Sequence, residues 1–143
     1  MSRAYDEIYL NDICKVTRTV FSRFIDSGKN FFAYVDRYMT LSEIRKKMDM
    51  GNWSALNKGS NQIFNSVDAD DIPSDTNENI DTMISDWIAD IYVTLQWKYD
   101  ISSSKISQLL PSHTLYQRFS PMHEASIEVG CDKLYAKYIE KKF

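Results

Sequence analysis

The chain has 143 residues, of which 43% are hydrophobic and 26% are charged, and only four are glycine. This composition excludes a disordered or collagen-like chain and is typical of one globular domain, or of two small ones that share a core. The net charge of −3 argues against attraction of the whole surface to nucleic acid.

Helical periodicity begins near the N-terminus. Apolar residues at helical spacing predict a first helix over residues 4–27, with Gly28 as its C-terminal cap. A second short helix is predicted over residues 30–39, and Ser60 is placed to cap another one farther along the chain. These helices belong to an N-terminal half that covers residues 1–67.

A further helix is predicted between the second one and Gly51. Thr40 and Glu43 have the T-x-x-E spacing of a capping box, so this helix is expected to begin at Thr40. The helical pattern divides its side chains between two faces, with Leu41, Ile44 and Met48 inward and Arg45, Lys46 and Lys47 outward.

An acidic segment separates this half from the rest of the chain. Residues 68–79 are rich in Asp, Asn, Ser and Thr, a composition typical of a solvated linker. Residues 1–65 carry a net charge of +3, residues 66–79 carry −5, and residues 80–143 carry −1. The N-terminal half is therefore basic, and an acidic boundary follows it.

The strongest helical pattern lies in residues 79–99, where Asn79 or Asp81 is the expected N-cap. Its apolar stripe comprises Ile80, Ile84, Trp87, Ile88, Ile91, Leu95 and Tyr99. Because each aromatic side chain buries roughly 150–250 Å², we interpret this segment as the central core helix. Trp97 lies off the stripe and is predicted to contact a second layer or a partner.

The C-terminal half, residues 80–143, continues with a short helix over residues 102–110. A last helix is predicted to open at Ser120-Pro121, with the proline in its first turn. Gly130 inside that helix costs about 1 kcal/mol relative to Ala, which indicates close packing there. No run alternates with period two for long enough to form a sheet. The predicted fold is all-α, a compact bundle of six to eight helices.

Cys14 and Cys131 are the only cysteines, and both lie in helical patterns, so we expect buried, reduced thiols. No window reaches the roughly 18 apolar residues of a membrane span, and the N-terminus lacks the apolar core of a signal peptide. We therefore expect a cytoplasmic protein without a membrane partner.

No residue set indicates a reaction. His113 and His123 are the only histidines, and no HExxH pattern accompanies them, so a metal site is not predicted. The chain contains neither a GxSxG elbow nor a glycine-rich phosphate loop. Asp68 and Asp70 begin like a calcium loop, but the required Gly and the Glu at the twelfth position are missing. No catalytic residue and no cofactor is predicted.

Two parts of the chain together resemble a known family. The first is YDEIYLND at residues 5–12. The second comprises Trp87, Tyr92, QWKY at 96–99, Leu115-Tyr116 and PMHEAS at 121–126. This combination is similar to a family of small helical proteins of Firmicutes and their mobile elements, whose genes lie beside toxin-like genes, including ADP-ribosyltransferase-like ones. The resemblance implies an antitoxin.

The sequence also departs from that family. Its members often carry a glycine-rich turn followed by an acid, whereas here Gly59-Ser60 is followed by Asn61, Gln62 and Ile63. This departure marks a divergent member whose partner could differ. A relative carried by a phage or mobile element could equally inhibit a host defence enzyme such as a CRISPR nuclease.

We therefore expect a non-enzymatic inhibitor that occludes a partner protein, a toxin or a defence nuclease. Protein interfaces favour Trp, Tyr and Arg as anchors, with charged residues at the rim. The chain could also form a homodimer. The expected contact residues are Tyr34, Arg45, Lys46, Lys47, Trp53, Asp68, Asp70, Asp71, Asp75 and Trp97, with the acidic ones as a mimic of nucleic-acid phosphate. The alternative is a nucleic-acid-binding regulator that uses the basic N-terminal half.

Overall fold

The computed structural model describes residues 2–140. Within them the chain is all-α, as predicted, and its one β-type pairing is an isolated bridge between Lys29 and Ser74. In chain order the elements are η1 (Glu7–Tyr9), α1 (Leu10–Asp26), α2 (Phe31–Leu41), α3 (Glu43–Asp49), α4 (Trp53–Leu56), α5 (Gly59–Asn65), α6 (Thr82–Tyr99), α7 (Ser103–Leu109), α8 (Ser112–Met122), α9 (Ile127–Leu134) and the π-helical turn η2 (Tyr135–Ile139).

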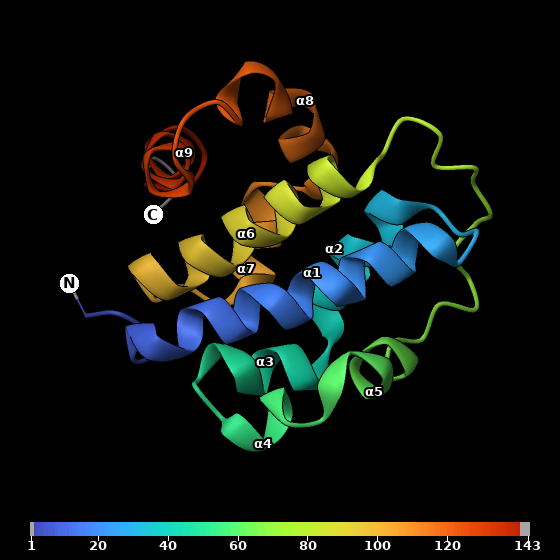
Figure 1. Ribbon diagram of the computed structural model, residues 1–143, viewed down its shortest axis with the longest axis horizontal. Helices are drawn as coiled ribbons and strands as arrows, with labels where there is room; N and C mark the ends of the chain where they lie inside the picture. The colour runs from blue at the N-terminus through green and yellow to red at the C-terminus, as the bar shows by residue number, and fades with distance from the viewer. Residues whose placement is uncertain (1, 141–143) are drawn as a thin grey trace.

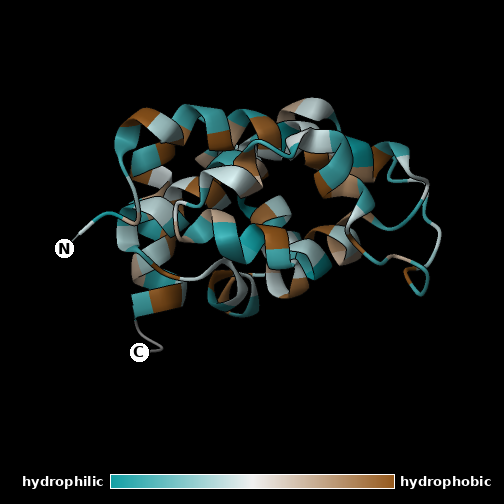
Figure 2. Ribbon diagram, turned by 90° about the horizontal axis from the view of Figure 1, so that it is seen from below, coloured by the Kyte–Doolittle hydropathy of each residue, from teal (hydrophilic) through white to brown (hydrophobic). Residues whose placement is uncertain are grey.

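Helix α6 occupies the centre of the bundle. Helix α1 runs beside it in the opposite direction, α3, α4 and α5 lie on the outer side of α1, and α8 and α9 lie on the other side of α6 (Figure 1). Along the helices hydrophobic residues alternate with hydrophilic ones, as expected where one helix face is buried (Figure 2). The arrangement leaves α3 and α4 on the outside of the molecule.

The central helix is close to its prediction. Its N-cap is Asp81, whose side chain accepts a hydrogen bond from the Ile84 N–H, and Asp100 ends it in the left-handed conformation. Residues 87–89 and 91–97 of α6 are all buried. The helix is therefore covered on most of its circumference, which the main apolar stripe in the sequence does not by itself indicate.

One hydrophobic core joins the two halves of the chain. Side chains from α1, α2, α6 and α7 belong to the same buried cluster, including Phe21, Phe24, Tyr38, Ile91, Leu95 and Ile106. Tyr92 of α6 is buried as well, and its hydroxyl donates to the Leu110 carbonyl at 2.6 Å. Because the halves share this core, neither has a separate interior.

The acidic segment, residues 68–79, has no helix and is fastened to the α1–α2 turn. The buried Asn77 side chain accepts from the Phe31 N–H and donates to the Lys29 carbonyl. The backbone N–H of Asn30 donates to the Pro73 carbonyl at 2.8 Å, and Ile72 is buried. The segment therefore keeps a fixed position on the bundle while its carboxylates stay exposed.

The last helix begins later than predicted. Ser120 has an extended backbone, so Pro121 follows a kink in α8 instead of opening a new helix. The N-cap of α9 is Ser126, whose side chain accepts from the Val129 N–H. The expected start at Ser120-Pro121 is wrong, because Ser126 has both the position and the hydroxyl that an N-cap needs.

Gly130 is buried beside Ile91 of α6, but the packing there is less close than the sequence predicts. A Cβ atom at this position would lie 3.4 Å from Ile91 Cδ1 and 3.8 Å from Met122 Cγ, which are ordinary contact distances. Gly130→Ala should therefore raise the free energy of unfolding by up to about 1 kcal/mol through helix propensity. Gly130→Leu should lower it by about 1–3 kcal/mol through overpacking. Urea unfolding of both variants checks this pair, and equal effects would contradict it.

Candidate protein-binding surface

Helix α3 begins at a different cap from the predicted one. Ser42 is extended and its hydroxyl accepts from the Arg45 N–H at 3.1 Å, whereas the Thr40 hydroxyl donates to the Asp36 carbonyl inside α2. The predicted capping box at Thr40 is therefore wrong. Ser42 breaks the helical path between α2 and α3, and this break turns α3 across the side of α1.

Arg45 is fully buried, which contradicts its predicted outward position. Its Nε donates to Asp49 Oδ1 at 3.1 Å and to Ser103 Oγ at 3.0 Å, and its Nη1 donates to Thr17 Oγ1 at 3.3 Å. Burial alone disfavours the charged form, but Tyr38 and Asp49 favour it more, and the net effect raises the pKa of Arg45. The guanidinium stays charged inside the protein.

Asp49 completes this buried ion pair. Its carboxylate accepts from the Ser103 N–H at 2.7 Å and from the Ser103 hydroxyl at 2.6 Å, and its carbonyl accepts from Gln96 Nε2 at 3.1 Å. Through Arg45 and Asp49, α3 is bonded to α1, α6 and α7. The inner side of α3 is thus fixed by directional contacts, and its outer side is held in one orientation.

The outer side of α3 consists of Glu43, Lys46 and Lys47, and the C-cap residue Met50 continues it at position i+7. Lys46 Nζ lies 3.2 Å from Glu43 Oε1, an exposed pair that contributes little to stability. Of the three cations predicted here, only Lys46 and Lys47 are on the surface. This outer side is about 10 Å long. It lies between two apolar features, a patch at the C-terminal end of α3 and a groove at its other end.

At the C-terminal end of α3 lies an apolar patch, which we call the end patch and define as Ile8, Tyr9, Met50 and Trp53. Ile8 is 70% exposed and Met50 is 73% exposed. The rings of Tyr9 and Trp53 pack with centroids 3.7 Å apart, and this contact brings η1 against the α3–α4 turn. Scattered single apolar residues are normal on a surface, whereas clustered ones are common at interaction sites, so the end patch is a candidate binding surface.

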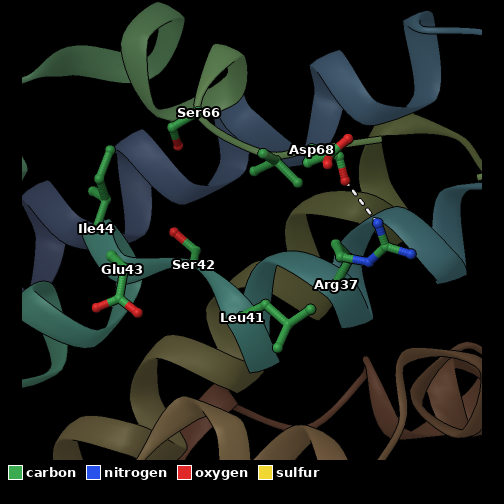
Figure 3. Close-up of a pocket in the computed structure, with 8 residues that line it drawn as sticks. Arg37, Leu41, Ser42, Glu43, Ile44, Ser66 and Asp68 are labelled. Atoms are coloured by element: carbon green, nitrogen blue, oxygen red, sulfur yellow. Dashed lines mark hydrogen bonds between the residues drawn. The ribbon is translucent and has the colours of Figure 1, made fainter. Parts of the chain in front are cut away.

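At the other end of α3 lies a groove with a volume of about 300 Å³. Leu41 and Ile44 come from the α2–α3 junction, Val67 follows α5, and Arg37, Glu43 and Asp68 stand around them (Figure 3). Leu41 is 62% exposed, although the sequence predicts an inward position. We refer to this site as the groove.

Charges of the acidic segment border the groove. The Arg37 guanidinium donates to the Asp68 carbonyl at 2.7 Å and to both carboxylate oxygens of Asp71, at 2.8 and 3.1 Å. The hydrogen bond from Arg37 lowers the pKa of Asp71. The carboxylates of Asp68 and Asp70 are exposed, and neither forms a salt bridge within residues 2–140. Of these three acidic residues only Asp68 lines the groove, and its charge interacts with the Arg37 guanidinium.

The remaining predicted contact residues lie apart from this surface or inside the protein. Tyr34 is buried and stacks on Phe24 with centroids 4.1 Å apart, so the expectation of an exposed ring is wrong. Trp97 is also buried, and its Nε1 donates to the Tyr5 carbonyl at 2.8 Å, which makes the second layer its contact. Asp75 is exposed and accepts from Asn30 Nδ2 at 2.7 Å.

Sequence reasoning missed Ile8, Leu41 and Met50. Ile8 matches the periodicity of the first helix and therefore reads as core, but η1 precedes α1 with a different pitch and turns it outward. Met50 follows the last turn of α3, where the periodic pattern no longer applies. The sequence did carry one signal for Met50, the glycine that follows it. In the structure Gly51 has a φ of +74°, which marks the turn after α3.

Other groups in the described part of the chain were also considered. Cys14 and Cys131 are free and buried, as predicted, and burial raises the pKa of Cys14 to about 12. Within residues 2–140, no three His, Cys, Asp or Glu side chains are grouped to hold a metal ion. None of the helices found there is long and apolar enough to cross a membrane.

Comparisons of the chain with protein-family models, with curated proteins and with solved structures found no match.

Proposed function

We propose that this chain is a non-enzymatic inhibitor that binds a partner protein through the outer side of α3 and the end patch. The partner would be a toxin, as for an antitoxin, or a defence nuclease, as for an anti-CRISPR protein. The observation that carries the proposal is the end patch, in which Ile8 and Met50 are each about 70% exposed beside the Tyr9–Trp53 pair.

The composition of the end patch suits a protein interface. Aromatic residues and Met are enriched at interfaces, and Trp and Tyr supply most of the residues whose truncation costs binding energy. Lys46 and Lys47 lie next to the patch on α3 and would form part of a polar rim. A rigid surface also loses less conformational entropy on binding, and the Arg45–Asp49 pair provides that rigidity.

Co-expression tests the proposal. The chain should restore growth of cells that produce an ADP-ribosyltransferase-like toxin, or should block cleavage by a CRISPR nuclease, and should elute with that enzyme as one complex on a sizing column. Absence of rescue, of inhibition and of a complex in both assays would refute it. A complex with duplex or single-stranded nucleic acid that weakens steeply with salt would instead favour the regulator.

Substitution of the end patch is expected to weaken the complex. Ile8→Lys combined with Met50→Lys places two charges in the interface and should reduce affinity at least about 30-fold, which corresponds to about 2 kcal/mol. The control is Met83→Lys, because Met83 is 64% exposed on α6 away from the patch. Titration calorimetry of the partner with the double variant and with the Met83→Lys control measures the difference in affinity. Equal affinities of the two variants would place the interface elsewhere.

A further inference from the structure

A second site lies at the opposite end of α1 from the end patch, where the acidic segment runs past the α1–α2 turn to α6 (Figure 1). A pocket of about 230 Å³ is lined there by Phe32 of α2, by His113 and Tyr116 of α8, and by Asp75 and Glu78 of the acidic segment. We call it the ring pocket. We infer that the ring pocket binds a guanidinium group, which goes beyond the proposed function and does not depend on it.

Three aromatic rings line one part of the ring pocket. The centroid of Phe32 lies 4.9 Å from that of His113 and 5.4 Å from that of Tyr116, in edge-to-face contacts. The centroids of His113 and Tyr116 are 6.0 Å apart. His113 is exposed, and the other two rings are half-buried. Because the face of an aromatic ring carries partial negative charge, these rings favour a cation, and a planar cation can stack on them.

Asp75 and Glu78 supply full negative charge to the same pocket. Both are exposed, and neither forms a salt bridge within residues 2–140. Among those residues, no Lys or Arg lines the pocket. Asp75 accepts hydrogen bonds from Asn30 Nδ2 at 2.7 Å and from the Asn77 N–H at 3.4 Å, which occupy only part of the acceptor capacity of a carboxylate. The pocket therefore offers uncompensated charge and free acceptors together.

The combination of rings and carboxylates selects among cations. A quaternary ammonium can lie over a ring, but it has no N–H group to donate to a carboxylate. A primary ammonium donates hydrogen bonds, but it is compact and strongly hydrated. A guanidinium is planar, weakly hydrated and carries five N–H donors, so it can stack on a ring and donate to carboxylates at once.

The backbone that carries the carboxylates is held in place by the bundle. The Asp75 N–H donates to the Gly28 carbonyl at 3.0 Å, and the Ile80 N–H donates to the Asn77 carbonyl at 3.1 Å. Asn77 has a φ of +54°, and its buried side chain donates to the Lys29 carbonyl at 2.8 Å. Binding in the ring pocket therefore requires little additional ordering of the chain.

NMR titration of the full chain with ethylguanidinium tests the inference. Drug-sized ligands occupy roughly 300–1,000 Å³, so a small probe suits this pocket. The probe should shift the methyl signals of Ile80, which lines the pocket, in a saturable manner and leave those of Ile8 in the end patch unchanged. Ethylurea is planar but uncharged, tetramethylammonium is charged but has no N–H donor, and each should bind at least about threefold more weakly. Equal binding of either control, or shifts outside the ring pocket only, would overturn the inference.

Removal of a carboxylate supplies a second arm. Glu78→Gln should weaken ethylguanidinium binding about threefold to fivefold, because an exposed charge contact is screened by solvent but still favourable. The control is Asp70→Asn, which makes the same carboxylate-to-amide change at an exposed position of the acidic segment that does not line the pocket. Unchanged affinity of Glu78→Gln, or an equal loss in Asp70→Asn, would overturn the inference.

Removal of a ring supplies a third arm. Tyr116→Leu should weaken the probe about threefold, whereas Tyr116→Phe keeps the ring and should bind within about twofold of the unchanged chain. The signal of the buried Ile88 methyl reports whether each variant keeps its fold. Equal affinities of the Leu and Phe variants, both folded, would contradict a role for the rings and overturn the inference.

A third guanidinium probe, N-acetylarginine methylamide, distinguishes the source of the group. Affinity at least equal to that of ethylguanidinium assigns the ring pocket to an arginine side chain of a protein, and clearly weaker affinity assigns it to a free guanidinium compound. Either result supports the inference, and no binding of either compound rejects it. Because these titrations need no toxin or nuclease, their failure leaves the end-patch test intact.

Discussion

Replacing Arg45 with Met is expected to lower the free energy of unfolding by about 3–5 kcal/mol, because the substitution leaves the buried Asp49 carboxylate without its cation. Ser103 and Gln96 would still contact Asp49, but they cannot neutralise its charge. Urea unfolding followed by circular dichroism measures the loss. The side chain of Met has a similar length, so the loss of charge outweighs the change in volume.

Two controls define the Arg45 result. Lys46→Met removes the neighbouring exposed cation and should change stability by less than about 0.5 kcal/mol. Combining Arg45→Met with Asp49→Leu removes both charges and should recover part of the loss, because no unpaired charge remains buried. If Arg45→Met is as stable as Lys46→Met, the guanidinium does not hold α3 in place.

Trp97→Ala is expected to destabilise the isolated protein by about 3–5 kcal/mol, the usual cost of emptying a core aromatic site. The ring is buried between α6 and the N-terminal segment, its Nε1 donates to the Tyr5 carbonyl, and the Arg3 guanidinium lies over it at 5.1 Å. Thermal and urea unfolding measure the effect. Trp97→Phe should cost less, because much of the packing is kept.

Binding separates the two interpretations of Trp97. If Trp97 is a core residue, Trp97→Ala should leave affinity for the partner nearly unchanged at temperatures where the variant is folded. Trp53→Ala is the comparison, since Trp53 is half-buried in the end patch and should affect binding more than stability. A normal melt with lost binding in Trp97→Ala would assign Trp97 to the interface.

Much of the helical framework could be predicted because helix caps and apolar periodicity are local signals. Asp81, Ser102 and Gly28 stand at helix ends as expected. The start of the last helix could not be placed, because Pro121 and Ser126 both satisfy local rules and only the backbone of Ser120 decides between them. Competition between two good local signals is settled by tertiary packing.

Arg45 is the clearest case of information that is absent from the sequence pattern. Arginine side chains are mostly exposed to solvent. Arg45 is an exception because most of its hydrogen-bond partners come from distant segments of the chain. Asp49 at i+4 was a visible hint, but Thr17 and Ser103 are brought to the site only by the packing of α1 and α7. Burial of this residue also removes one cation from the proposed nucleic-acid surface.

The sequence indicated some of the residues that the proposal now uses. Lys46 and Lys47 are exposed on the outer side of α3, as expected, whereas Trp53 is half-buried against Tyr9. The apolar members of the surface were not identified, because Ile8 and Leu41 fit the periodicity of core residues. Exposure of an apolar residue depends on which elements cover it, and periodicity alone does not determine that.

Hydrogen–deuterium exchange of the chain alone and in complex with its co-expressed partner tests the central claim most directly. If the outer side of α3 and the end patch form the interface, slower exchange should appear in residues 5–9 and 41–53, while α8 and α9 should exchange as in the free chain. Protection confined to α8 and α9, or no protection in a stable complex, would contradict binding through α3.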